Sequence, residues 1–184
     1  MPFIDTGFVA LKVFEPKVFN DSRGYFLETF NENTFKEAGI DSKFVQDNES
    51  KSQFGVVRGL HYQLHPFAQA KLVRVVLGEV LDVVVDMRRG SPTFGKKYEI
   101  LLTGENKRQL YIPRGFAHGF SVLKDDTVFC YKCDNFYNKE SEGGILLTDP
   151  ALNIDWQVPN DKMLLSEKDL ANPIFKDCRN NFDF

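Results

Sequence analysis

Two runs, Lys71-Leu-Val-Arg-Val-Val-Leu77 and Val80-Leu-Asp-Val-Val-Val-Asp86, decide the fold class of this 184-residue chain. Both are rich in β-branched residues, which favour strands. In the second run, polar Asp82 and Asp86 recur at strand spacing among apolar residues. Gly78-Glu79 joins the two runs, and a two-residue link with glycine is typical of a tight turn. We therefore predict that the two runs pair as a β-hairpin.

Similar short runs recur along the chain, separated by Gly, Pro, Asn or Asp. No long helical pattern separates them, which favours a sandwich or barrel over a doubly wound sheet. The aromatic content of 14% also suits half-buried pleated surfaces. We predict an all-β fold with further strands at Gly24–Phe30, Phe54–Gln63, Lys97–Leu102, Gln109–Ile112, Gly119–Leu123 and Val128–Cys133.

Two short helices are expected at the periphery of this β body. The first runs from Asn31 to Ala38, because a capping residue precedes a helix-forming run and Gly39 follows it. The second begins near Ser166, where Ser166-Glu-Lys-Asp169 matches a capping box and Pro173 stops the run.

The composition is that of an ordinary globular protein, with 42% hydrophobic and 27% charged residues. Its length predicts one domain spanning residues 1–184. No apolar run approaches the roughly 20 residues that a membrane-spanning helix needs. The 23 basic and 26 acidic residues give a net charge of −3, so no global basic field attracts nucleic acid or an anionic membrane. An anionic ligand must therefore be met by local cations.

The three cysteines point to reduced thiols in the cytoplasm. They cannot close a disulfide framework, and the first residues, Met1-Pro2-Phe3-Ile4-Asp5, lack the pattern of a signal peptide. Cys130-Tyr-Lys-Cys133 is a C-x-x-C pair, but the chain has no second pair for a zinc ribbon. Because strand residues three apart point to opposite faces, we interpret these two cysteines as ordinary strand thiols.

The histidines limit any metal hypothesis, because there are only three. A catalytic zinc or iron site needs about three protein ligands. Gly59-Leu-His61-Tyr-Gln63 and Pro113-Arg-Gly-Phe-Ala-His118 resemble the two signatures of the cupin superfamily of small β-barrels. Metal-binding cupins have a second histidine where this chain has Gln63, and His65 precedes Pro66, where the strand is expected to end. We predict that no metal is bound.

Several polar residues allow both a structural and a functional interpretation. Tyr131 shares a strand face with Phe129 and Cys133, as a core aromatic would. Arg23 and Arg58 have the pattern of ordinary surface arginines. Arg58 and His61 are an odd number of residues apart, so a regular strand would separate them unless Gly59 introduces a bulge. Lys168 and Asp169 fit a solvated residue and the acid of a capping box.

Six motifs in register resolve these alternatives. They are Asp21-Ser-Arg-Gly-Tyr-Phe26, Phe44-Val-Gln-Asp-Asn48, Val57-Arg-Gly-Leu-His-Tyr-Gln63, Lys71-Leu-Val-Arg74, Ile112-Pro-Arg-Gly-Phe-Ala-His-Gly-Phe120 and Ser166-Glu-Lys-Asp169. In this order, they closely resemble the dTDP-4-dehydrorhamnose 3,5-epimerase family. The resemblance implies a jelly-roll barrel of the cupin type, no metal or organic cofactor, and a homodimer in which the N-terminal segments reach the partner.

The family reaction inverts C3 and C5 of dTDP-4-dehydro-6-deoxy-D-glucose, giving dTDP-4-dehydro-L-rhamnose for dTDP-L-rhamnose and cell-surface polysaccharide synthesis. The alternative is a related enzyme that inverts C3 alone. Both C–H bonds lie α to the C4 carbonyl, so a base can remove each proton if the enolate is stabilised. By the resemblance, His61 is that base, Asp169 its partner, Lys71 the cation at the enolate, and Tyr131 the acid on the opposite face.

The remaining matches imply a substrate-binding set. Its members are Arg23, Arg58 and Lys168 for the diphosphate; Glu28, Gln46, Asp47, Asn48, Phe26 and Tyr137 for the base and nearby groups; His118 and Glu142 on the sugar or nucleotide side; and Gln63. Paired arginine donors suit the oxygens of a diphosphate, and an aromatic ring suits the face of a base.

Overall fold

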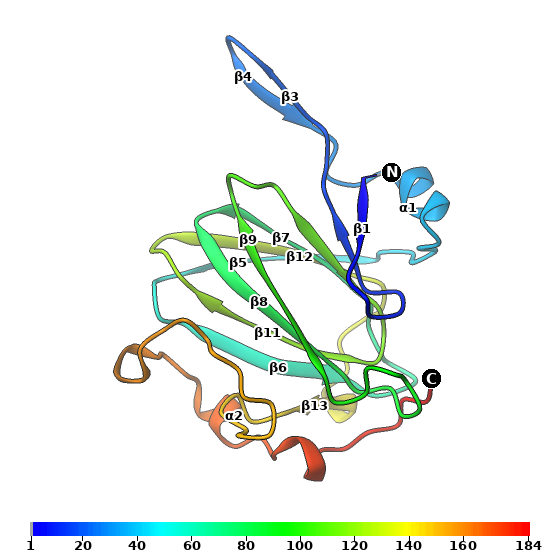
Figure 1. Cartoon of the computed structure of the whole chain (residues 1–184), viewed down its shortest axis with the longest axis vertical. Helices are drawn as coiled ribbons and strands as arrows, with labels where there is room; N and C mark the ends of the chain where they lie inside the picture. Colours follow the sequence, from blue (N-terminus) through cyan, green and yellow to red (C-terminus); the bar gives the residue numbers. More distant parts are fainter. Residues whose placement is uncertain (1) are drawn as a thin grey trace.

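The computed structural model describes residues 2–184, and its described strands form two facing antiparallel sheets and a separate hairpin (Figure 1). In spatial order, the six-stranded sheet contains β1 (Phe3–Asp5), β2 (Lys12–Phe14), β10 (Gln109–Ile112), β7 (Lys71–Leu77), β12 (Thr127–Cys133) and β5 (Gln46–Ser52). The five-stranded sheet contains β13 (Glu142–Gly144), β6 (Val57–Gln63), β11 (Phe116–Val122), β8 (Glu79–Asp86) and β9 (Lys97–Thr103). The predicted all-β jelly-roll class is confirmed.

The predicted hairpin between residues 71 and 86 is wrong, although both strands exist. Strand β7 pairs with β10 and β12, whereas β8 pairs with β9 and β11 in the other sheet. Gly78 carries the chain between the sheets with a φ of +83°. A Cβ on Gly78 would lie 2.8 Å from Thr127 Cα, so this corner has no room for a side chain. A short glycine link joins two sheets as readily as two paired strands, and the sequence pattern does not distinguish them.

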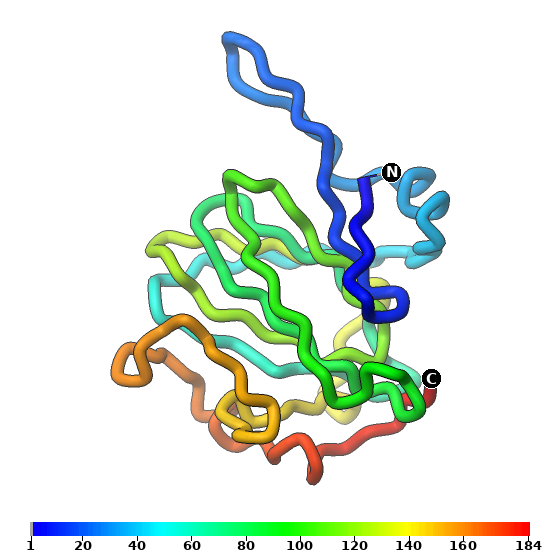
Figure 2. Tube along the Cα trace, viewed as in Figure 1, coloured from blue at the N-terminus to red at the C-terminus, as the bar shows by residue number. Residues whose placement is uncertain are grey.

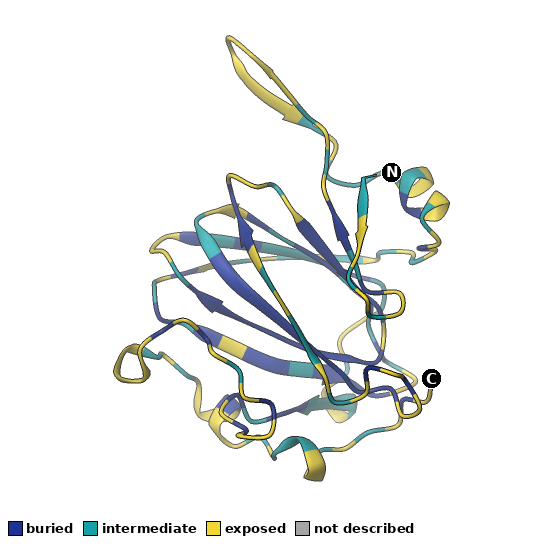
Figure 3. Ribbon diagram, in the orientation of Figure 1, coloured by how far each residue is buried: buried dark blue, intermediate teal, exposed yellow. Residues whose placement is uncertain are grey.

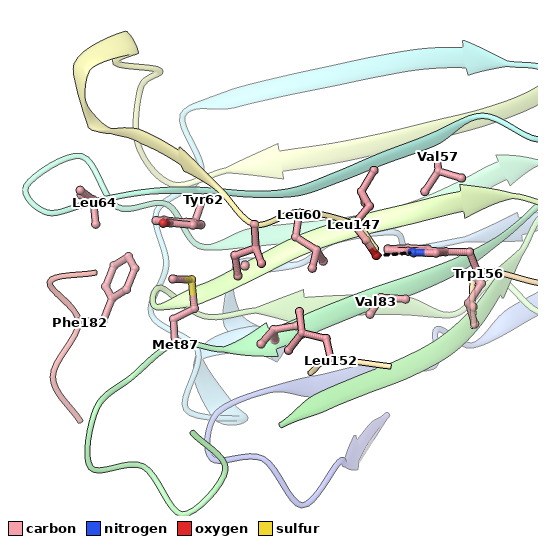
Figure 4. Packing of buried hydrophobic residues seen from close by; sticks show 14 of the residues in the cluster. Val57, Leu60, Tyr62, Leu64, Val83, Met87, Leu147, Leu152, Trp156 and Phe182 are labelled. Atoms are coloured by element: carbon pink, nitrogen blue, oxygen red, sulfur yellow. Dashed lines mark hydrogen bonds between the residues drawn. The ribbon is translucent and has the colours of Figure 1, made fainter. Parts of the chain in front are cut away.

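Two hydrophobic cores lie on the two faces of the five-stranded sheet. The first lies between the sheets and includes Val73, Val84 and Phe129. The second lies between the outer face of that sheet and the chain after β13 (Figures 2 and 4). There Trp156 is 2% exposed and its indole nitrogen donates a hydrogen bond to the carbonyl oxygen of Leu147, at 3.0 Å. The second core fixes the C-terminal segment against the barrel.

Both predicted helices are present and short. Helix α1 spans Glu32–Glu37, and the side chain of Asn31 caps its first turn. Helix α2 spans Glu167–Leu170, and Ser166 is its capping residue. Three single 3-10 turns lie at Lys139–Ser141, Asn160–Lys162 and Phe175–Asp177. No helix in residues 2–184 is long and apolar enough to cross a membrane.

The strands β3 (Val18–Asp21) and β4 (Gly24–Leu27) form a hairpin that projects away from both sheets (Figures 1 and 3). We call residues 18–27 the arm. Most of its residues are exposed, including the apolar side chains of Phe19, Tyr25 and Phe26. The predicted strand Gly24–Phe30 therefore ends early, and its first half belongs to this arm.

Candidate active site

A cavity of about 590 Å³ opens between the two sheets and the C-terminal segment. Strands β6 and β11 supply His61, Arg58 and His118, while the opposite sheet supplies Lys71, Asn48 and Tyr131. Helix α2 adds Lys168 and Asp169 at the edge of β6. The structure thus brings together side chains from two sheets and a helix.

His61 and Asp169 form the closest ionisable pair in this cavity. His61 Nε2 lies 2.6 Å from Asp169 Oδ1, and the Asp169 side chain is 5% exposed. With a carboxylate on Nε2, that nitrogen carries the hydrogen and Nδ1 is left as the basic nitrogen. Burial lowers the pKa of His61, while the negative charge of Asp169 opposes that shift. His61 is therefore a neutral, oriented base near pH 7.

Ser166 holds the other carboxylate oxygen. Its hydroxyl donates to Asp169 Oδ2 at 2.7 Å and accepts a hydrogen bond from the Asp169 backbone N–H at 3.1 Å. Asp169 therefore occupies the acidic position of the predicted capping motif and also contacts His61. The structural and the functional interpretation of this residue both apply.

Lys71 and Tyr131 face the cavity from neighbouring strands of the six-stranded sheet. Lys71 Nζ lies 6.0 Å from the centre of the Tyr131 ring. Burial lowers the pKa of Lys71 and raises that of Tyr131. A phenol with a raised pKa keeps its proton at neutral pH, and an enclosed ammonium interacts strongly with developing negative charge.

Arg58 and His61 reach the same cavity because β6 is irregular. The pairing between β6 and β11 shifts register between His118 and Phe120. Gly59 lies at this shift with a φ of +130°, and a Cβ there would lie 2.9 Å from the His118 carbonyl oxygen. Arg58 then donates a hydrogen bond to Ser52 Oγ at 3.3 Å. The separation of Arg58 and His61 in the sequence does not by itself predict that both side chains face one cavity.

His118 has a carboxylate partner, Asp82, that the sequence does not mark as a functional residue. His118 is the cross-strand neighbour of His61, and its Nε2 lies 2.9 Å from Asp82 Oδ2. Asp82 is 0% exposed, and its Oδ1 has no hydrogen-bond partner in the described chain. The sequence signal was an acid in a valine-rich run, which we interpreted only as strand alternation.

At the cavity rim, Glu142 connects two side chains. It accepts hydrogen bonds from the Tyr137 hydroxyl at 2.9 Å and from Lys168 Nζ at 2.5 Å. A smaller lobe of about 180 Å³ lies beside it, lined in part by Gln46, Asn48 and Tyr137. Gln63 also lines this lobe, but its amide is occupied: it donates to the carbonyls of Phe67 and Phe136 and accepts from the Asn138 N–H. Gln63 therefore holds the loop that carries Tyr137.

Four predicted substrate-binding residues lie away from the cavity of their own chain. Arg23 pairs with Asp21 at 2.6 Å in the arm, and Phe26 there is 68% exposed. Glu28 follows the arm and accepts hydrogen bonds from Asn31. Asp47 points to the outer face of β5 and pairs with Lys132 at 2.8 Å. Within one chain, the structure therefore does not bring Arg23 together with Arg58 and Lys168, the other cations assigned to the diphosphate, because the arm carries it outward.

The described residues do not assemble a metal site. No group of three or more His, Cys, Asp or Glu side chains in residues 2–184 is placed to hold an ion. His65 lies beyond β6 and packs edge-on against Phe182, with ring centres 5.4 Å apart. Cys133 is buried beside the cavity, whereas Cys130 contacts Glu49 on the other face of β12. The two cysteines therefore do not form one motif.

Comparison with known proteins supplies the family. The sequence model described as dTDP-4-dehydrorhamnose 3,5-epimerase matches residues 5–177. The dTDP-4-dehydrorhamnose 3,5-epimerase of Shigella flexneri is 57% identical over 179 residues, covering 97% of this chain and 98% of that protein.

Two solved structures are similar throughout. The dTDP-4-dehydrorhamnose 3,5-epimerase of Elizabethkingia anophelis has a TM-score of 0.93 and 54% identity, covering 97% of this chain and 98% of that one. The dTDP-6-deoxy-D-glucose-3,5-epimerase of Legionella pneumophila, in complex with dTDP-4-keto-L-rhamnose, has a TM-score of 0.90 and 50% identity, covering 95% and 92%. This chain belongs to the dTDP-4-dehydrorhamnose 3,5-epimerase family.

Proposed function

We propose that this protein converts dTDP-4-dehydro-6-deoxy-D-glucose to dTDP-4-dehydro-L-rhamnose by inverting C3 and C5. The observation that carries the proposal is the His61–Asp169 pair, 2.6 Å apart, in a cavity whose opposite wall holds Lys71 and Tyr131. A base and an acid on opposite walls are what inversion of a carbon next to a carbonyl requires. The family and the complex of the Legionella relative supply the substrate class.

The residues divide the reaction as follows. His61 Nδ1 removes the proton from a carbon next to the C4 carbonyl, and Asp169 stabilises the imidazolium that forms. The Lys71 ammonium stabilises the negative charge that develops on the C4 oxygen. Tyr131 returns a proton to the opposite face of the carbon. Each carbon uses the same base, because both protons lie α to one carbonyl.

The nucleotide half of the substrate lies, in this proposal, towards the rim. Arg58 and Lys168 supply positive charge for the diphosphate, and Tyr137 stacks on the thymine. Gln46 and Asn48 in the smaller lobe supply amide donors and acceptors for the base. His118 and Glu142 contact the sugar or the nucleotide, and Gln63 acts through the Tyr137 loop rather than by direct contact.

We extend the proposal to a homodimer in the cytoplasm. On the arm, Phe19, Tyr25 and Phe26 are 51%, 55% and 68% exposed. Contact with a second copy of this chain would bury these aromatic side chains. Arg23 and Phe26 on the arm, and Glu28 directly after it, lie away from the cavity of their own chain, so two chains that exchange arms would complete both sites. The molecular mass in solution tests this point, and a monomer that is fully active would contradict it.

The alternative is inversion at C3 alone. The ligand named in the structure of the Legionella relative, dTDP-4-keto-L-rhamnose, has the L configuration, which inversion at C3 alone cannot give because it is set at C5, and this favours the double epimerase. The test is to incubate the protein with dTDP-4-dehydro-6-deoxy-D-glucose and determine the product by NMR. Coupling constants that show inversion at C3 and C5 are expected. A product inverted only at C3, or a 3-keto isomer, would contradict the proposal.

A further inference from the structure

The segment Leu164–Pro173, which we call the strap, delivers Asp169 to His61. On one side of β6 lies β11, but on the other side β13 covers only the half of β6 from His61 to Gln63. The strap runs along the rest of that edge and contains helix α2. Helix α2 has only four residues, so the position of Asp169 depends on how the two ends of the strap are attached.

The first attachment is made by backbone hydrogen bonds. The Leu164 N–H donates to the Gly55 carbonyl at 2.8 Å, and the Val57 N–H donates to the Leu164 carbonyl at 3.1 Å. These bonds tie the start of the strap to the chain that enters β6. Between the two attachments, Leu165 packs against the second core, Lys168 pairs with Glu142 and Asp169 contacts His61.

The second attachment is the close packing of the Asn172 side chain against Gly144. A Cβ on Gly144 would lie 2.5 Å from Cγ, Nδ2 and Oδ1 of Asn172, so the Asn172 amide occupies the space that any side chain there would need. Asn172 Nδ2 is buried and has no hydrogen-bond partner in the described chain. The Leu146 N–H donates to the Pro173 carbonyl at 2.8 Å beside it. Gly144 is also the register partner of His61 in the β13–β6 pair.

We infer that Gly144 and Asn172 are positioning residues, whose close fit sets the distance between Asp169 and His61. The contact links the strand position opposite His61 to the strap, three residues after Asp169. A side chain on Gly144 would displace the Asn172 amide by about 1 Å to reach ordinary contact. Because the Asn172 N–H donates to the Asp169 carbonyl at 3.5 Å, we expect this displacement to reach Asp169 and to lengthen its 2.6 Å contact with His61.

A longer distance between Asp169 and His61 should lower the pKa of His61. Burial lowers the pKa of His61, and the Asp169 charge raises it. Moving Asp169 away therefore lowers the pKa of His61 further, and the fall in kcat/KM on acidification moves to lower pH. A misplacement of about 1 Å in a catalytic contact costs on the order of 10²-fold in rate. Of the residues proposed to bind the nucleotide, only Lys168 lies on the strap, so kcat should change more than KM.

The experiment is a double-mutant cycle with Gly144→Ala, Asn172→Ala and the double variant. Gly144→Ala should lower kcat at least tenfold and lower the pKa of His61, measured by NMR titration of a chain with only three histidines. Asn172→Ala removes all three atoms that the new Cβ would meet, so the double variant should return to within about threefold of the wild type. Asn172→Gln adds a methylene to the same contact from the other side and should act like Gly144→Ala.

Gly143→Ala is the matched control, because its Cβ would meet the Tyr62 ring at 2.5 Å instead of the strap. It should lower Tm without lowering the pKa of His61, and Asn172→Ala should not rescue it. The inference is wrong if Gly144→Ala and Asn172→Gln change only Tm, or if Asn172→Ala fails to restore the His61 pKa. The activity readout rests on the proposed function, but the titration does not: inactive wild-type protein would refute the function and leave this test intact.

Discussion

Replacing Asp169 by Asn tests the base most sharply, because it removes one charge and keeps the shape. In the native site, Asp169 Oδ1 lies 2.6 Å from His61 Nε2, and Ser166 holds Oδ2 at 2.7 Å. The Asn side chain offers an amide N–H or a carbonyl to Nε2. Either choice removes the negative charge, and an amide N–H would force the hydrogen of His61 onto Nδ1, where it blocks the basic nitrogen.

The size of the effect follows from the geometry. Charge centres of a carboxylate and an imidazolium in direct contact lie about 4 Å apart, which gives about 4 kcal/mol at an effective dielectric constant of about 20. The His61 side chain is 33% exposed, so solvent reduces this interaction, and we expect the pKa of His61 to fall further in the variant. The loss of imidazolium stabilisation predicts a fall in kcat of roughly 10²–10³-fold.

The assay is kcat and KM across pH 5–9, followed by NMR of the sugar protons. In the wild type, activity falls as pH falls through the His61 pKa, which lies below its usual value. In Asp169→Asn, this acidic limb should move to lower pH while the plateau falls and KM stays within about threefold. A variant with a wild-type plateau would refute the role of Asp169, and a change confined to KM would assign it to substrate binding instead.

Three further predictions concern the opposite wall and the fold. Tyr131→Phe removes the proton donor but not the base, so solvent deuterium should still enter the substrate while inversion falls by ~10²-fold; inversion at the native rate would exclude Tyr131 as the acid. Lys71→Gln removes the cation at the C4 oxygen and should lower kcat ~10²–10³-fold, whereas an unchanged kcat would require another group to stabilise the enolate. Gly78→Ala places a side chain at a φ of +83° within 2.8 Å of Thr127, which should cost about 2–4 kcal/mol and lower Tm by roughly 4–16 °C; an unchanged Tm would contradict the account of this corner.

The sequence predicted strands better than it predicted their partners. Runs such as Lys71–Leu77 are strongly β-branched, and each forms a strand. Which sheet a strand joins depends on contacts from distant parts of the chain, so the link at Gly78 did not show that β7 and β8 separate. Strand β5 was missed because Gln46–Ser52 contains no apolar residue, and its pairing with β12 comes from backbone hydrogen bonds.

The candidate site was predictable only in part from residue chemistry. His61 and Asp169 lie 108 residues apart, so no local spacing relates them, and the family resemblance alone paired them. Asp82 was noted as a strand residue, but its contact with His118 arises only when β8 and β11 pair. Gln63 was assigned to the substrate from its position, whereas its three hydrogen bonds to backbone groups support a neighbouring loop.

In the proposed mechanism, one histidine, His61, removes the protons at both C3 and C5. The most direct test is to incubate the protein with dTDP-4-dehydro-6-deoxy-D-glucose in D₂O and follow both positions by NMR, with His61→Ala as the comparison. We expect deuterium at both carbons with the wild type and at least ~10²-fold slower incorporation at both with His61→Ala, while dTDP binding is retained. Incorporation at either carbon that continues at the native rate in His61→Ala would contradict this mechanism.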